Sequence, residues 1–155
     1  MIRLRKIDSS NWAEMLGLSV RSDQQRFIAN DSPIAAIVLS KAYVRSMGAD
    51  WEPYAIYLDE TPIGLFAFVS GIKDSEDWWI FHYFVDHQYQ NRGYGKAGLR
   101  EAIEHARNNG KCIGISLVVH PENAQAKRMY ESMGFVPTGG RRWDHDEYRN
   151  RFASK

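Results

Sequence analysis

A strand–helix–strand unit in the second half of the chain constrains the fold more than any other feature of the sequence. Trp78–Val85 is an unbroken run of large apolar and aromatic residues with polar ends, and a run of this length predicts a buried strand. Gly95–Arg107 then carries apolar residues at helical spacing on one face, and Cys112–Val119 is a second buried run. We expect this unit to be a right-handed crossover that joins two parallel strands of one sheet.

The patterns on either side of this unit predict a mixed sheet that is mostly antiparallel. Apolar runs between turn-forming residues predict strands over Ile2–Ile7, Pro53–Leu58, Ile63–Ser70, Phe135–Thr138 and Glu147–Ala153. N-cap residues, Pro33 and terminal glycines predict helices from Asp8–Asn11 to about Val20, from Pro33 to about Met47, and over Asn123–Met133. The predicted fold class is therefore α/β, with six to seven strands flanked by about four helices. Residues 1–155 are expected to form a single domain, since no repeat or linker divides them.

Composition excludes several classes of function. The formal net charge of +1 argues against nucleic-acid binding, which usually needs a clear basic excess. Cys112 is the only cysteine, so neither an internal disulfide nor a cysteine-based zinc site is possible, and the histidines lack metal-ligand spacing. The N-terminus lacks the apolar core of a signal peptide, and no apolar run reaches the roughly 20 residues that span a bilayer. We expect a soluble cytoplasmic protein with no metal, no nucleic-acid partner and no membrane partner.

The loop after the first buried strand contains a G-x-G-x-x-G pattern over Gly93–Gly98, which in a Rossmann fold holds a dinucleotide. Its context differs from that fold. Seven residues separate Val85 from Gly93, the flanking elements are hairpins, and the next strand ends in His120 rather than in an acidic residue. The spacing of a P-loop is absent as well. Binding of NAD is therefore disfavoured.

The same loop keeps the features of a phosphate site. Gly93 and Gly95 let backbone amides approach a ligand without a Cβ atom in the way. They open a helix, whose unpaired N–H groups and dipole attract anions, and Arg92 and Lys96 add positive charge. The alternative is a glycine-rich turn that binds no ligand.

Two segments resemble the GNAT family of N-acetyltransferases. Gln90–Gly95, QNRGYG, matches its Q/R-x-x-G-x-G/A loop, and Asn123–Phe135, NAQAKRMYESMGF, matches its N-x-x-A-x-x-φ-Y-E-x-x-G-F segment. The order and separation of both motifs make the resemblance specific, and it covers residues 54–153. It implies a twisted sheet with a central, splayed pair of parallel strands and a bulge in the first of them. Scattered residues between Leu18 and Tyr57 further resemble bacterial diamine or polyamine (spermine/spermidine) acetyltransferases.

The resemblance implies transfer of an acetyl group from the cosubstrate acetyl-CoA to an amine that attacks it directly. The pyrophosphate would lie on the amides of Arg92 to Ala97, and the pantetheine arm and acetyl oxygen on backbone groups of Phe84 and Val85. The residues implied in cofactor binding are Phe84, Val85, Gln90, Asn91, Arg92, Gly93, Tyr94, Gly95, Lys96, Ala97 and Asn123. Asn123 has an alternative role as a helix N-cap.

Two residues are candidates for proton transfer. Tyr130 matches the family's tyrosine that protonates the departing thiolate, and the alternative is a tyrosine of the core. His82 is the candidate general base because imidazole titrates near neutral pH, and the alternative is a histidine satisfied by its neighbours. Carboxylates that could bind the acceptor's ammonium group are Asp23, Glu52, Glu76 and Asp77. Aromatic residues that could hold it, or instead form core or a dimer interface, are Trp51, Tyr54, Trp78, Trp79 and Trp143.

The acceptor is the least determined part of the function. The first hypothesis is a primary amine of a small molecule, with polyamines among the candidates. An amino acid, an antibiotic or a protein amine is the alternative acceptor. Outside enzymes, the alternative is a non-catalytic acyl-CoA-binding module that senses the cofactor and contacts a partner. The sequence leaves the oligomeric state open, and a homodimer is the candidate assembly.

Overall fold

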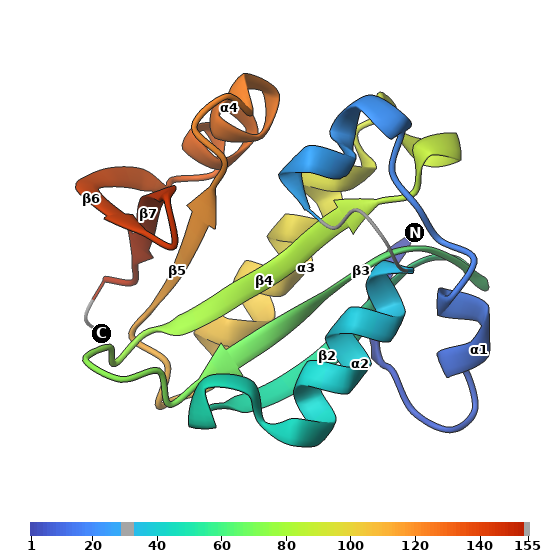
Figure 1. Ribbon diagram of the computed structural model, residues 1–155, viewed down its shortest axis with the longest axis horizontal. Coiled ribbons are helices and arrows are strands. Elements are labelled where there is room, and N and C mark those ends of the chain that lie inside the picture. Colours follow the sequence, from blue (N-terminus) through green and yellow to red (C-terminus); the bar gives the residue numbers. More distant parts are fainter. Residues whose placement is uncertain (29–32, 154–155) are drawn as a thin grey trace.

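The computed structural model describes residues 1–28 and 33–153 (Figure 1). The elements in chain order, with η for a 3-10 helix, are β1 (Ile2–Lys6), α1 (Trp12–Met15), η1 (Ser22–Phe27), α2 (Ile34–Val44), η2 (Ser46–Gly48), β2 (Asp50–Leu58), β3 (Thr61–Ser70), β4 (Trp78–Val85), η3 (His87–Tyr89), α3 (Tyr94–Asn108), β5 (Gly114–Val119), α4 (Ala124–Ser132), β6 (Val136–Arg142) and β7 (His145–Arg151).

The strands form one seven-stranded sheet in the order β1-β2-β3-β4-β5-β7-β6. Every neighbouring pair is antiparallel except β4 and β5, which are parallel and are connected through α3. The predicted fold class is confirmed, and so is the parallel strand pair at its centre. The strand predicted over Trp78–Val85 has the predicted bounds, whereas β5 begins at Gly114 rather than at Cys112.

Alternate residues of the central strands enter two cores, one on each face of the sheet. Ile56 of β2 and Phe66 of β3 pack with Leu99 of α3. The next residues along, Ala55 and Leu65, pack on the opposite face with buried residues of α1 and α2. Figure 1 shows the result, with α2 in front of the sheet and α3 behind it.

β4 and β5 pair at one end and diverge beyond it, as Figure 1 shows. Only the first two residues of β4 pair with β5, where they lie opposite Ile115 and Ser116. The carboxylate of Asp77, whose exposed fraction is 3%, fastens this end. It accepts a hydrogen bond of 2.6 Å from Ser116 Oγ and forms an ion pair of 2.7 Å with Arg149 of β7. The splayed strand pair therefore opens toward the carboxyl ends of both strands.

A bulge interrupts the pairing of β3 with β4 where the splay begins to widen. The register shifts between Leu65 and Ala67, so His82 and Tyr83 together lie opposite Phe66. His82 has a φ of 59°, in the left-handed region that a non-glycine residue seldom adopts. A bulge adds one residue to a strand and turns its side chains, which brings His82 out of the regular alternation.

Several element boundaries differ from the predicted ones. The first helix ends at Met15 rather than near Val20, because Asp86 and His87 exchange hydrogen bonds with the backbone of Ser19 and hold that segment outside a helix. The second helix ends at Val44 rather than near Met47, because Arg45 is left-handed at a φ of 53°.

Two further differences concern the strands. β2 begins at Asp50, before the predicted Pro53, because its first residues pair with the far end of β3. The last hairpin is longer at its turn than predicted, with β6 extending to Arg142 and β7 beginning at His145. Within residues 1–28 and 33–153, no helix has the length and apolar character needed to cross a membrane.

Candidate functional site

A cleft of about 830 Å³ opens where β4 and β5 diverge. Its lining comes from the bulged end of β4, the end of β5, the start of α3, and α4. On the other side, η1, α2 and η2 contribute residues, and Trp143 of the β6–β7 turn closes one corner. The cleft thus joins the two segments that resemble acetyltransferase motifs, although a helix and a strand separate them in the sequence.

The loop before α3 presents backbone amides at the edge of this cleft. Asn91 and Gly93 have φ values of 64° and 83°, and these left-handed residues turn the chain from β4 into α3. A Cβ atom at Gly93 would meet nothing within 4 Å. The left-handed backbone conformation, and not crowding by protein atoms, therefore favours glycine at this position. The Ala97 amide already donates to the Gly93 carbonyl at 3.1 Å. The amides just before it lack partners within the helix and can receive an anion.

The predicted cofactor residues divide into two groups. Phe84, Val85, Gln90, Asn91, Gly93, Gly95, Lys96 and Asn123 line the cleft. Arg92, Tyr94 and Ala97 lie outside its lining. Eight of the eleven residues implied in cofactor binding therefore meet in one cleft.

Gln90 has a role that the motif does not reveal. Its Nε2 donates to the carbonyl oxygen of Val85 at 2.9 Å and to Gln24 Oε1 of η1 at 3.0 Å, and its Oε1 accepts from Arg21 at 3.1 Å. These bonds tie the end of β4 to η1. The Val85 carbonyl oxygen therefore already accepts a hydrogen bond within the protein.

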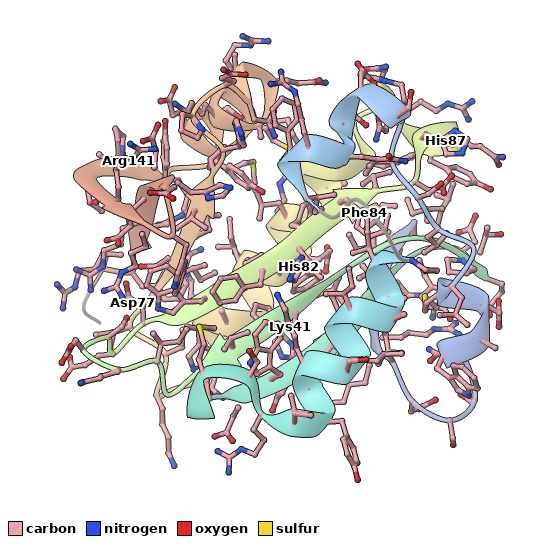
Figure 2. All side chains as sticks on the ribbon, viewed as in Figure 1. Lys41, Asp77, His82, Phe84, His87 and Arg141 are labelled. Atoms are coloured by element: carbon pink, nitrogen blue, oxygen red, sulfur yellow. The ribbon has the colours of Figure 1, made fainter. Side chains whose placement is uncertain are left out.

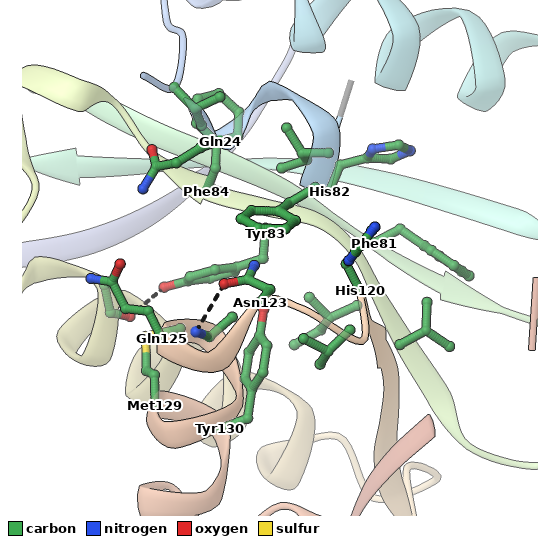
Figure 3. Close-up of a pocket in the computed structure, with 18 of the residues that line it drawn as sticks. Gln24, Phe81, His82, Tyr83, Phe84, His120, Asn123, Gln125, Met129 and Tyr130 are labelled. Carbon is green, nitrogen blue, oxygen red and sulfur yellow. Dashed lines mark hydrogen bonds between the residues drawn. The ribbon is translucent and has the colours of Figure 1, made fainter. Parts of the chain in front are cut away.

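Tyr130 of α4 lies at the base of the cleft and points toward Asn123 and Tyr83 (Figure 3). Its ring packs edge-on against Phe135, with centroids 5.7 Å apart. Burial raises the pKa of the Tyr130 phenol well above its ordinary value of 10, so the hydroxyl stays protonated at neutral pH. A buried, protonated phenol that faces a cleft can donate a proton to a nearby anion.

Asn123 caps α4, as its alternative role predicted. Its Oδ1 accepts a hydrogen bond of 3.2 Å from the amide of Ala126. Its side chain also lines the cleft next to Tyr130, so capping leaves it in reach of a ligand (Figure 3).

Tyr83 was not singled out by the sequence, because nothing in the run Trp78–Val85 distinguishes one aromatic residue from another. Its hydroxyl donates to the Gly95 carbonyl at 2.6 Å and fixes the first turn of α3 to β4. A Cβ atom at Gly98 would lie 2.6 Å from that hydroxyl and 3.1 Å from Ile56. The third glycine of the pattern therefore lets α3 approach the sheet closely.

His82 is held by a lysine in a way that weakens it as a base. Its Nε2 lies 2.9 Å from Nζ of Lys41 on α2, and Figure 2 shows the two side chains directed toward each other. Burial, followed by the positive charge of Lys41, lowers the pKa of His82 to about 4. The neutral ring then accepts a hydrogen bond from the Lys41 ammonium. Because its one basic nitrogen is engaged and its basicity is low, the predicted role of His82 as general base is disfavoured.

The predicted acceptor carboxylates are scattered rather than gathered. Asp23 lines the cleft but pairs with Arg21 at 3.2 Å. Asp77 is buried at the paired end of β4 and β5, and Glu52 and Glu76 lie outside the cleft lining.

The aromatic candidates divide in the same way. Trp51 and Trp143 line the cleft. Trp79 is buried in the core beside α2, and Tyr54 and Trp78 pack in the other core, on the α3 face. No group of three potential metal-ligating side chains occurs among the described residues.

Sequence comparison identifies related proteins. The sequence model of the acetyltransferase (GNAT) family matches residues 30–135. A spermine/spermidine N(1)-acetyltransferase of Bacillus subtilis is 27% identical over 142 residues, which cover 89% of this chain and 90% of that protein.

Solved structures share the fold at low sequence identity. The aminoglycoside acetyltransferase AAC(6')-Ib in complex with coenzyme A has a TM-score of 0.79 at 19% identity, over 97% of this chain and 95% of its own. A spermidine N-acetyltransferase from Vibrio cholerae in complex with CoA and spermine has a TM-score of 0.69 at 17% identity, over 96% and 92%.

Proposed function

Because the chain belongs to the GNAT acetyltransferase family, we propose that it transfers the acetyl group of acetyl-CoA to a primary amine of a small molecule. The observation that carries this proposal is the single cleft in which the amides before α3, the splayed ends of β4 and β5, and Tyr130 meet. An anion site, a slot for an extended arm and a proton donor are the three parts that this transfer needs.

Acetyl-CoA would occupy the part of the cleft between β4, β5 and α4. Its pyrophosphate would accept hydrogen bonds from the amides of Gly93 to Lys96, beside the side chain of Lys96. Its pantetheine arm would lie in the splay, along Phe84 and Val85 on one side and Asn123 on the other. The gap suits this arm because residues of β4 beyond Trp79 leave their backbone edge unpaired on the side of β5.

The transfer follows from these positions. The neutral amine of the acceptor attacks the carbonyl carbon of the thioester, and backbone N–H groups at the bulged end of β4 stabilise the negative oxygen. The carbon–sulfur bond then breaks, and Tyr130 donates its proton to the departing thiolate. The proton released by the amine passes to water, since His82 is engaged by Lys41, and the Tyr130 phenolate regains a proton from solvent before the next turnover.

The relatives make a polyamine the first acceptor to test, because both a curated relative and a structural neighbour are polyamine acetyltransferases by name. The amine of an amino acid, an antibiotic or a protein is the alternative acceptor, and the neighbour named for aminoglycosides supports the antibiotic. A non-catalytic acyl-CoA-binding module is the alternative outside enzymes. A cytoplasmic location and a homodimer remain predictions, which cell fractionation and light scattering would test.

Two measurements test the proposed function. Calorimetry is expected to show binding of acetyl-CoA and no binding of NAD at the same concentration. Release of free thiol, followed over a panel of amines, is expected to exceed the rate without acceptor for at least one amine. Absence of acetyl-CoA binding would contradict the proposal, and binding without thiol release for any amine would favour the non-catalytic module.

Gly93→Ala is expected to weaken acetyl-CoA binding by about tenfold. A left-handed residue other than glycine costs about 1–2 kcal/mol, and the chain would relieve this strain by moving the amides away from the phosphates. Gly110→Ala is the matched control, because Gly110 lies beyond the other end of α3 and a Cβ atom there also meets nothing within 4 Å. If calorimetry gave equal dissociation constants for both variants, the predicted role of Gly93 in cofactor binding would be contradicted.

A further inference from the structure

The cleft lacks an unpaired carboxylate within its described lining. Two carboxylates occur there, Asp23 and Glu122. Each already forms an ion pair with an arginine, Asp23 with Arg21 and Glu122 with Arg26. An ammonium group of an incoming acceptor would therefore have to displace an arginine in order to find a carboxylate partner.

Lys41 supplies the cleft with a positive charge instead. It projects from α2 into the cleft, and its half-buried side chain forms no ion pair with a carboxylate among the described residues. Its Nζ lies 2.9 Å from His82 Nε2 and 5.5 Å from the centroid of the Trp51 ring. A neutral histidine and an aromatic face thus fix the position of this ammonium group, but neither neutralises it.

The aromatic wall reinforces this arrangement. Trp51 stacks on Phe81 with ring centroids 5.4 Å apart, and Lys41 already lies over the Trp51 ring. The cation–π position that an acceptor ammonium could have taken on Trp51 is therefore occupied by the protein itself. A second ammonium group at this place would meet the like charge of Lys41.

The hydrogen-bond donors of Lys41 that His82 does not use indicate which kind of ligand Lys41 can bind. An ammonium group has three donors, of which His82 accepts one, so the other donors are available to a molecule in the cleft. Burial of this group disfavours its charge, as the lowered pKa of Lys41 indicates, and an anion beside it would offset that cost.

From these contacts we propose that Lys41 binds an anionic group of the acceptor, so that the preferred substrate is a primary amine whose molecule also carries a carboxylate or a phosphate. This inference rests on the proposed acetyl transfer and names the class of its acceptor. Polyamines, which carry only positive charges, then become poor substrates. His82 acts as a positioning residue, because it holds the Lys41 ammonium toward the cleft.

The test compares acceptors that differ only in charge. Straight-chain primary alkylamines of matched length carry at their far end a carboxylate, a carboxamide, a phosphate or a second ammonium group. Wild-type kcat/KM is expected to be about ten- to a hundredfold higher for the carboxylate or the phosphate than for the carboxamide, the range of a hydrogen bond to a charged group. The ammonium form is expected to be the slowest. The relative rates of carboxylate and phosphate identify the natural anion.

Variants of Lys41 then attribute the preference. Lys41→Arg keeps the charge and should keep the preference, whereas Lys41→Gln keeps a donor for His82 and should remove it. Lys41→Glu should reverse it toward the diamine. Acetyl-CoA affinity, measured by calorimetry, should change little in all of them. A wild-type preference for the diamine, or a preference unaltered by Lys41→Gln, would overturn the inference while leaving acetyl transfer intact. Absence of thiol release with every amine would instead contradict the proposed function.

Discussion

Tyr130→Phe is expected to lower kcat of acetyl transfer by about a hundredfold or more, while the affinity for acetyl-CoA changes little. The substitution removes the hydroxyl that faces the cleft but keeps the ring that packs on Phe135 at 5.7 Å. The thiolate would then leave without a positioned proton donor. Stopped-flow measurement of thiol release at saturating acetyl-CoA, together with calorimetry, separates the effect on chemistry from an effect on binding.

A second buried tyrosine provides the matched control. Tyr148 of β7 lies in the same core, with its hydroxyl 3.2 Å from Glu131 and outside the cleft lining. Tyr148→Phe should leave kcat within about threefold of the wild type, since loss of one hydrogen bond costs about 1 kcal/mol of stability and moves no reacting group. If both variants slow the reaction equally, Tyr130 acts through packing rather than as an acid.

The pH dependence follows from the same group. Because burial raises the pKa of Tyr130 above the ordinary value of 10, the acid stays protonated through neutral and mildly alkaline pH. Deprotonation of this proton donor should therefore cause no decline of kcat in the neutral and mildly alkaline range. A decline of kcat centred near neutral pH that disappears in Tyr130→Phe would contradict the assignment.

Arg149→Met is expected to destabilise the fold by about 3 kcal/mol and to lower the Tm by roughly 6–12 °C. The substitution leaves the carboxylate of Asp77, with 3% of its surface exposed, without its ion-pair partner at 2.7 Å. The carboxylate keeps its hydrogen bond from Ser116 Oγ, but a buried charge that has lost its ion-pair partner strongly destabilises the fold. This estimate lies at the low end of the usual range because the Arg149 side chain is itself 35% exposed. Thermal and urea unfolding would measure both quantities.

Two controls distinguish the buried charge from a general loss of arginine. Arg141→Met removes an exposed pair with Asp146, with side chains 57% and 32% exposed, and should cost less than about 1 kcal/mol. Combining Asp77→Asn with Arg149→Met removes the unpaired charge and should recover part of the lost stability. Equal destabilisation by the single and the double variant would show that the carboxylate's charge is not the cause.

The elements that could be predicted from the sequence are those that the local periodicity of apolar residues determines. Trp78–Val85 has its predicted bounds because a continuous apolar run of that length fits a buried strand better than a helix. The first helix was predicted too long because its true end depends on Asp86, which is distant in the sequence and bonds the amide of Ser19. A contact of that kind leaves no periodic signal in the residues that it constrains.

The residues of the candidate site likewise fall into those found from local sequence motifs and those that only the fold reveals. The loop of Gln90–Gly95 and the segment around Tyr130 are contiguous motifs, so they could be found in the sequence, and the fold places both in one cleft. Lys41 could not be found, because in the sequence it is one lysine in the last turn of a helix. Only its contact with His82, which lies on a different element, shows that it faces the cleft. The proposed role of His82 as a base depended on the ordinary pKa of imidazole, which burial and the Lys41 charge alter.

The sequence by itself determined the family, the order of strands and helices, and the loop that can receive a phosphate, because each of these depends on residues that are neighbours along the chain. The tertiary structure alone decided which charges in the cleft lining are paired. Electrostatic interaction depends on distance in space and on burial, and the fold pairs the carboxylates Asp23 and Glu122 with arginines while it leaves Lys41 beside a neutral histidine.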